Sequence, residues 1–250
     1  EGLGNVDLRT SIVKSSNTYY YALANDLGVD AIHDFMAPFG FGQITGIDLH
    51  GEQSGILPSQ AWKRAAYKRA DQQRWYAGET ISLGIGQGYN SFTMLQLASA
   101  TATLANRGVQ YPPHLMRAIR ESRNSTAQTM SSVTPRDLNL NQKNVDHIIE
   151  AMVGVTQEGT SRLSFANAPY LSAGKTGTAQ ALTIGQNEKY DAKKLAEYER
   201  DHALYIAFAP ADAPEIALAI VVENAGFGSA HAAPIARRVF DYVLLGQYPS

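Results

Sequence analysis

Two apolar segments near the C-terminus, joined by a short connection that contains two prolines, constrain the fold of this chain more than any other feature. Residues 203–209 and 216–223 are rich in Ala, Ile, Leu, Val and aromatic residues, and residues 210–214 between them read Pro-Ala-Asp-Ala-Pro. Short apolar runs bounded by turn residues predict strands, and a connection this short makes them an antiparallel hairpin. Residues 172–182 predict another strand. We therefore expect an antiparallel sheet.

Helical patterns occupy much of the remaining chain. Apolar spacing predicts helices over residues 17–27, 31–36, 93–106, 144–157 and 233–245, and a polar helical excursion over residues 191–200. Gly28 and Gly108 are expected C-terminal caps, and Pro234 is expected near the first turn of the last helix. Residues 40–60 are glycine-rich and irregular. Helices that flank an antiparallel sheet give an α+β fold.

The length and composition fit one domain. The chain has 250 residues, of which 44% are hydrophobic, enough for one large core, and it has no internal repeat or low-complexity linker. Its net charge of −2 argues against general affinity for nucleic acid. It contains no cysteine, which excludes disulfides and cysteine catalysis, and its six histidines lack zinc-protease spacing. We expect no metal and no cofactor.

Two segments superficially match ligand-binding patterns. Residues 61–76 interleave basic and aromatic residues, which can indicate nucleic-acid binding, but in a slightly acidic chain we interpret them as a solvated, partly mobile segment. Residues 84–88 read Gly-Ile-Gly-Gln-Gly and lack both the spacing of a dinucleotide loop and the lysine of a phosphate loop. Nucleotide binding is therefore not expected.

A run of small and hydroxylated residues around Lys175-Thr176-Gly177-Thr178 carries most of the functional information. The lysine places a cation on the rim of a cleft, Gly177 lets a substrate backbone lie against an edge strand, and the threonines offer hydroxyls to a carboxylate. A Ser-x-Asn element, Ser15-Ser16-Asn17, lies near the start of the chain.

Together these motifs resemble those of the transpeptidase domain of class B penicillin-binding proteins. The surrounding sequence is similar to the elongation-type group of that family, penicillin-binding protein 2, from Ser15 to about Tyr242. The similar segments are residues 18–21, 27–30, 39–42, 45–49, 84–88, 208–210 and 232–236. The resemblance implies a penicillin-binding/β-lactamase-like fold, and residues 1–250 would form the C-terminal portion of one transpeptidase domain. The segment 84–88 would be a tight turn near the cleft floor.

The nucleophilic serine of this family lies in a third motif, Ser-x-x-Lys, on a separate upstream helix. Ser11 and Lys14 form such a string, but they directly adjoin Ser15 and cannot approach the cleft from a separate element. We interpret them as a decoy. The chain begins at Glu1 and has neither a signal peptide pattern nor a run that could span a bilayer. We therefore expect a fragment that lacks the nucleophile and is inactive alone.

The resemblance also implies roles for the residues that are present. Ser15 would relay a proton to the leaving amine, and Asn17 would hydrogen-bond the substrate amide and the catalytic lysine. Lys175 would supply positive potential and a hydrogen bond to the Ser15 hydroxyl. Thr176 and Thr178 would bind the terminal carboxylate, and the Thr178 N–H would be one of two oxyanion donors.

The implied reaction is peptidoglycan D,D-transpeptidation: a serine attacks the D-alanyl-D-alanine carbonyl of a stem peptide, and the amine of a neighbouring stem takes the acyl group. A serine β-lactamase is an alternative, although no Glu-x-x-x-Asn arrangement lies between the two motifs. A non-catalytic scaffold or sensor is another. The implied ligands are stem peptides and β-lactams, and the implied partner is a membrane glycan-polymerising glycosyltransferase. The implied location is the periplasmic face of the bacterial inner membrane, with an N-terminal helix outside this chain as anchor.

Overall fold

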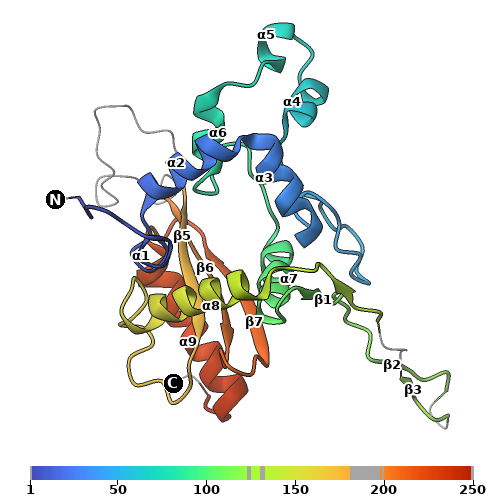
Figure 1. Ribbon diagram of the computed structural model, residues 1–250. Coiled ribbons are helices and arrows are strands. Elements are labelled where there is room, and N and C mark those ends of the chain that lie inside the picture. Colours follow the sequence, from blue (N-terminus) through green and yellow to red (C-terminus); the bar gives the residue numbers. More distant parts are fainter. Residues whose placement is uncertain (1, 123–124, 130–132, 181–197, 199, 249–250) are drawn as a thin grey trace.

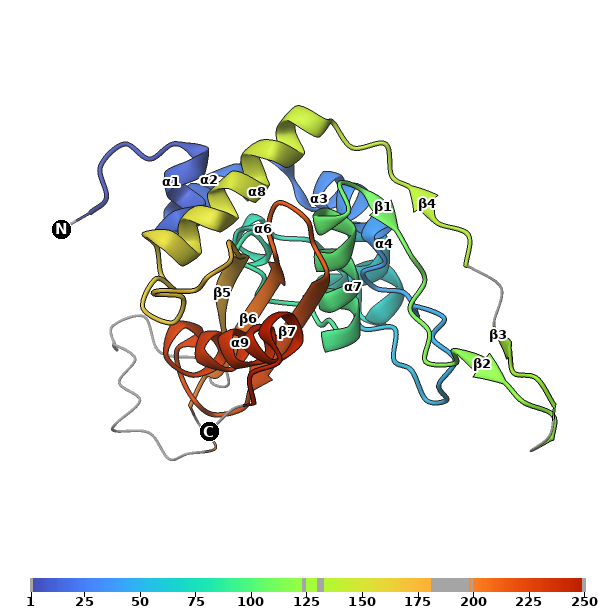
Figure 2. The same ribbon diagram turned by 90° about the horizontal axis from the view of Figure 1, so that it is seen from below.

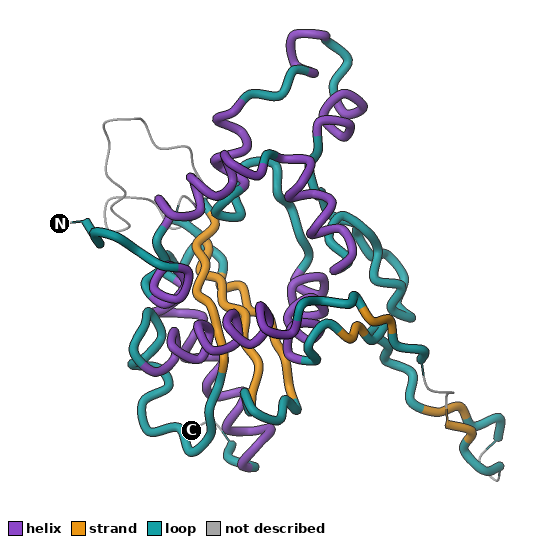
Figure 3. The backbone as a smooth tube through the Cα atoms, in the orientation of Figure 1, coloured by secondary structure: helices purple, strands orange, loops and turns teal. Residues whose placement is uncertain are grey.

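A three-stranded antiparallel sheet lies near the centre of the protein (Figures 1 and 3). This computed structural model describes residues 2–122, 125–129, 133–180, 198 and 200–248. The strands are β5 (Ala173–Ala179), β6 (His202–Ala209) and β7 (Ile216–Val222), arranged in the order β5-β6-β7. The last residue of β6 pairs with the first of β7. The predicted hairpin, the adjoining strand and the α+β class are therefore confirmed.

Helices cover both faces of the sheet. On one face, α9 (Gly228–Leu245) packs along β6, as Figure 2 shows. On the other face, α8 (Gln142–Gln157) packs against β5 and α7 (Met94–Ala105) packs against β7. The short helix α1 (Leu8–Val13) lies against α8. The sheet thus lies between two helical layers.

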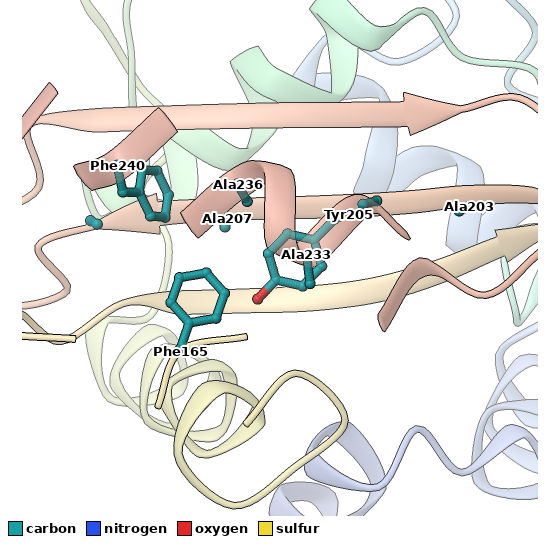
Figure 4. Close-up of a cluster of buried hydrophobic side chains, with 9 residues drawn as sticks. Phe165, Ala203, Tyr205, Ala207, Ala233, Ala236 and Phe240 are labelled. Atoms are coloured by element: carbon teal, nitrogen blue, oxygen red, sulfur yellow. The ribbon is translucent and has the colours of Figure 1, made fainter. Parts of the chain in front are cut away.

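The core between α9 and the sheet combines a few large aromatic residues with many alanines (Figure 4). Phe240 on α9 and Tyr205 on β6 are almost wholly buried, and Phe165 packs against both. The alanines let the helix lie close to the strand: Ala203, Ala207, Ala209, Ala232, Ala233 and Ala236. The ring of Tyr205 also needs space on β5, because a Cβ at Gly174 would lie 2.2 Å from the Tyr205 hydroxyl oxygen.

The remaining helices lie before and between the motif-bearing elements. They are α2 (Asn17–Leu27), α3 (Val29–Met36), η1 (Ala37–Phe39), α4 (Gln60–Ala66), α5 (Ala70–Gln73) and α6 (Ala77–Leu83). The predicted helices over residues 17–27, 31–36, 93–106 and 144–157 are confirmed, with ends that move by at most two residues. Residues 40–59 form no helix or strand, as predicted, apart from one isolated bridge at Ile56.

One predicted helix start and one predicted cap residue are wrong. The last helix begins at Gly228 and not near residue 233, so Pro234 lies inside α9. Gly108 is expected to cap the end of α7. The left-handed residue there is instead Arg107, with φ 57°, one position before Gly108. The Gly108 N–H donates to the Thr103 carbonyl at 2.8 Å and that of Arg107 to Leu104 at 2.9 Å. This is a Schellman motif whose C′ residue is arginine.

Two short ladders were not predicted. β1 (Val109–Gln110) pairs with β4 (Arg136–Asp137), and β2 (Ala118–Ile119) pairs with β3 (Gln128–Thr129). β1 contacts α7, and the β2–β3 ladder lies on an arm that projects away from the central sheet (Figure 1). Strands of two residues carry too little periodicity to be recognised in a sequence. The helical excursion predicted for residues 191–200 lies mostly outside the described residues.

The interpretation of residues 61–76 as a solvated segment is wrong at Lys63, whereas the other basic residues are exposed as predicted: Arg64, Lys68, Arg69 and Arg74. Lys63 is only 3% exposed and forms an ion pair with Glu79. Its Nζ lies 5.3–5.4 Å from the ring centroids of Trp75, Tyr76 and Tyr89. These three rings therefore surround a buried cation.

Candidate active site

The fold brings Lys175 and Ser15 together although they are 160 positions apart. Lys175 lies on β5, and its Nζ donates a hydrogen bond to the Ser15 Oγ at 2.7 Å. Ser15 lies in the tight turn between α1 and α2, with φ 55°. The turn is closed by the Ser16 N–H, which donates to the Ser11 carbonyl at 2.9 Å. The predicted contact between the two motifs is thus present.

The environment of Lys175 changes its acidity. Burial lowers the pKa of Lys175 to about 8, since a desolvated ammonium is less stable than a hydrated one. Its Nζ also donates to the Thr176 carbonyl at 2.9 Å. At neutral pH the side chain is still mostly protonated, so it can stabilise negative charge on the Ser15 oxygen or on a ligand.

A cleft of about 580 Å³ opens beside this hydrogen bond. All six residues predicted to act or bind line it: Ser15, Asn17, Lys175, Thr176, Gly177 and Thr178. Asn17 is the first residue of α2 and is exposed to solvent. The segment 84–88 also contributes, through Gly84, Ile85 and Gln87, so it lies at the cleft as expected. The cleft therefore combines a cation, hydroxyls, an amide and strand backbone.

The two threonines have different partners. The Thr176 hydroxyl lies 3.0 Å from that of Thr160, which follows α8. The Thr178 carbonyl accepts a hydrogen bond from Gln87 Nε2 at 3.2 Å. Between them, Gly177 is backed by α9: a Cβ at Gly228 would lie 2.5 Å from the Gly177 carbonyl oxygen. The beginning of α9 thus approaches the motif strand as closely as backbone atoms allow. The carboxylate-binding role of the threonines stays a prediction.

Ser11 and Lys14 have other surroundings. Ser11 is fully buried, and its Oγ donates to the Leu8 carbonyl at 2.6 Å and lies 3.1 Å from the Tyr20 hydroxyl. Lys14 is the cap residue that follows α1, and it is exposed. A serine that donates to the carbonyl of its own helix is held away from Lys14. These contacts agree with the interpretation of a decoy, which stays a prediction until acylation is mapped.

Sequence reasoning missed Gln87 and Lys63. Gln87 lies between Gly86 and Gly88, and these two glycines are the sequence signal of a tight turn; the structure confirms the turn with φ of 78° and 70°. Among the described residues, no group of three or more His, Cys, Asp or Glu could hold a metal ion. Within the same part of the chain, every helix is too short or too polar to cross a bilayer.

Comparison with known proteins agrees with this geometry. The family described as "Penicillin binding protein transpeptidase domain" matches residues 1–241. Peptidoglycan D,D-transpeptidase MrdA of Acinetobacter baumannii is 43% identical over 98% of this chain and 35% of its own length. The chain spans only 35–38% of such curated relatives.

Solved structures share the fold. Penicillin-binding protein 2 of Pseudomonas aeruginosa, in complex with WCK 5153, has a TM-score of 0.79 and 41% identity, covering 96% of this chain and 48% of its own. A peptidoglycan synthase complex that coordinates polymerization and crosslinking includes a chain with a TM-score of 0.76 and 30% identity, covering 96% and 37%. The family match, the relatives and the paired motifs in one cleft lead to one conclusion: the chain belongs to the penicillin-binding protein transpeptidase family.

Proposed function

We propose that this chain is the C-terminal portion of the transpeptidase domain of an elongation-type peptidoglycan D,D-transpeptidase. The complete protein cross-links stem peptides by serine acyl transfer and is a target of β-lactams. The observation that carries this proposal is the 2.7 Å hydrogen bond from Lys175 to Ser15 in a cleft that Asn17 and Thr178 also line. Two residues of different polar character, far apart in sequence, are held in hydrogen-bonding contact where a substrate can reach them.

The roles proposed for these residues follow from their chemistry. The Ser15 hydroxyl relays a proton to the nitrogen of the leaving group, and the Lys175 ammonium supplies positive potential and a hydrogen bond to the Ser15 oxygen. Asn17 offers an amide that can both donate to and accept from a substrate amide. The backbone N–H of Thr178 is one donor to the oxyanion, a contact whose loss slows such reactions about 10²–10³-fold.

The nucleophile is proposed to lie on a helix outside residues 1–250. An apolar groove of about 690 Å³ supports this proposal. It runs between η1, α7 and α8, and it shares Ile148, Met152 and Ile206 with the cleft. A helix laid in the groove would bury its apolar lining and bring a serine beside Lys175 and Ser15. The limited share of the curated relatives that the chain spans also fits this proposal.

The partner and the location are proposed on the same basis. Cross-linking requires glycan strands, so a membrane glycosyltransferase that polymerises them is the expected partner. The match to a chain of a peptidoglycan synthase complex supports it. Because the stem peptides of bacterial peptidoglycan lie outside the inner membrane, the complete protein would act on the periplasmic face, held there by an N-terminal membrane helix.

Acylation by a penicillin in the complete protein tests the function. Intact mass and peptide mapping should show one adduct on a serine upstream of residue 1. Lys175→Ala should slow acylation at least about 100-fold, because it removes a charged donor from the site. Ser11→Ala, a change at a serine outside the cleft, should keep the rate within about twofold.

Other outcomes would overturn the proposal. Rapid turnover of nitrocefin would make the protein a serine β-lactamase. A folded protein without any adduct would be a scaffold or sensor. An adduct on Ser11 would make Ser11 and Lys14 the working nucleophile and base, and unchanged acylation in Lys175→Ala would remove Lys175 from the mechanism.

A further inference from the structure

The cleft-facing edge of β5 is occupied by two side-chain donors. Lys175 Nζ donates to the Thr176 carbonyl at 2.9 Å, and Gln87 Nε2 donates to the Thr178 carbonyl at 3.2 Å. In an antiparallel strand, residues two apart direct their N–H and C=O to the same side. Among the described strands, β5 pairs only with β6. The backbone groups of Thr176 and Thr178 therefore face the cleft along an open strand edge.

The turn that carries Gln87 is held at both ends. At its start, a Cβ at Gly84 would lie 2.6 Å from the Tyr20 carbonyl oxygen, so the turn is packed tightly against α2. Just after it, the Tyr89 hydroxyl donates to Glu79 at 3.0 Å. The Gln87 N–H itself donates to the Ser82 carbonyl at 3.2 Å. The backbone is thus anchored, and the half-buried Gln87 side chain is the part that can move.

The Gln87 bond resembles the bond that an incoming peptide would make. The donor is a primary amide N–H, chemically close to a peptide N–H, and the acceptor is a carbonyl on an open strand edge. Extended peptides bind such edges by adding a strand, which brings a backbone N–H to each exposed carbonyl. A ligand with an amide N–H at this register can take the place of Gln87 without leaving the Thr178 carbonyl unpaired.

We propose that Gln87 is a specificity-determining residue that occupies the Thr178 carbonyl until an amide N–H of the acyl donor replaces it. A ligand that lacks this N–H leaves Gln87 as the donor to the carbonyl. In a protein without Gln87, a ligand that lacks the N–H buries the Thr178 carbonyl without a donor, which costs free energy. A ligand that carries the N–H donates to this carbonyl itself, and no Gln87 side chain competes with it. This inference rests on the proposed function, and it concerns which acyl donors the cleft accepts.

The test compares acylation of the complete protein by two penicillins that differ at one atom. Benzylpenicillin carries a side-chain amide, and its ester analogue has oxygen in place of the amide nitrogen. In Gln87→Ala, the second-order rate of acylation should fall about 10-fold for the ester and stay level or rise for the amide. Gln87→Glu, which has no N–H to donate, should shift the ratio of the two rates in the same direction.

A matched control separates this role from a structural one. Gln110 Nε2 donates to the Phe39 carbonyl at 3.2 Å, a bond of the same kind and length made outside the cleft. Gln110→Ala should leave the ratio unchanged. If Gln87→Ala slows both penicillins equally, Gln87 only supports the turn and the inference fails while the proposed function stands. If the unmodified protein is acylated by neither, the proposed function fails and this inference fails with it.

Discussion

Ser15 shows how a single backbone conformation positions the site. Its φ of 55° lies in the left-handed region that residues other than glycine rarely adopt, at a cost of about 1–2 kcal/mol. α1 ends at Val13 and α2 begins at Asn17, so only three residues connect the two helices. The turn aims the Ser15 hydroxyl at Lys175 and places Asn17 beside it. The strain is thus located at the residue for which we propose the proton relay.

The lowered pKa of Lys175 predicts a pH-dependent step. In the complete protein, acylation by a carboxylate-bearing penicillin should weaken as pH rises through about 8, because the neutral amine no longer attracts the carboxylate. Lys175→Arg stays protonated, so it should lose this step even if its rate is lower. The measurement is the second-order rate of acylation between about pH 6 and 10. A step that persists in Lys175→Arg would assign the titration to another group.

The lowered pKa of Lys175 also makes the free energy of unfolding depend on pH. Between about 8 and the ordinary lysine value of 10.5, the folded state binds fewer protons at Lys175 than the unfolded state. The contribution of this residue to the free energy of unfolding therefore rises with pH across that window. Below about pH 8, Lys175 is charged while buried, and this desolvation lowers the stability of the folded protein. Such a cost is consistent with the catalytic role proposed for Lys175.

Helices α4 and α6 are joined through one buried ion pair. Lys63 on α4 meets Glu79 on α6, and Tyr89, just past the cleft-lining turn, donates to the same carboxylate. Burial opposes ionisation of Glu79, but hydrogen bonds from Lys63, the Tyr76 backbone and Tyr89 outweigh it and lower its pKa. Its contribution to stability is therefore present above the ordinary carboxyl pKa and is lost as pH falls through the lowered value.

Removal of Lys63 should destabilise this region strongly. Lys63→Met leaves the Glu79 carboxylate without its cation in a mostly buried position, and the expected loss is roughly 3 kcal/mol of unfolding free energy. Chemical denaturation of the complete protein, followed by circular dichroism, measures it. Arg69→Met is the control, since the Arg69–Asp71 pair in the same region is exposed and worth at most about 1 kcal/mol. Equal losses in the two variants would contradict a special role for the buried pair.

The two helical layers and the sheet form one packed body, and the motif strand β5 lies within it. α9 packs against β6 through alanines and approaches β5 at Gly177, while α8 and α1 support the opposite face. Tyr170 donates to Asp241 at 2.7 Å and so ties the segment before β5 to α9. The motif strand is held from both sides, which fixes the position of Lys175.

Truncation of the central aromatic cluster should therefore destabilise the protein as a whole. Phe240 is fully buried, so Phe240→Ala removes its ring contacts and leaves a cavity, with an expected loss of about 3–5 kcal/mol. Tyr242→Ala on the same helix is the control, because Tyr242 is 47% exposed and should change stability by less than about 1 kcal/mol. Thermal unfolding of both variants checks this. A small loss in Phe240→Ala would mean that α9 contributes little to the core.

The sequence by itself determined the features that depend on neighbouring residues. The hairpin of β6 and β7 follows from two apolar runs and a short turn, and the helices over residues 17–27 and 144–157 follow from apolar periodicity. The family resemblance identified Ser15, Asn17 and the Lys175 motif, because those residue types and their surroundings are set by the chemistry they share.

Only the tertiary structure decided the features that depend on residues far apart in the chain. Lys63 looked solvated until Glu79 and three aromatic rings surrounded it, and Gln87 became part of the cleft only through its bond to Thr178. The start of α9 at Gly228 depends on backbone contact with β5 and β6, which no local signal encodes. Burial and long-range hydrogen bonds join residues that are far apart in the sequence, so no single segment predicts them.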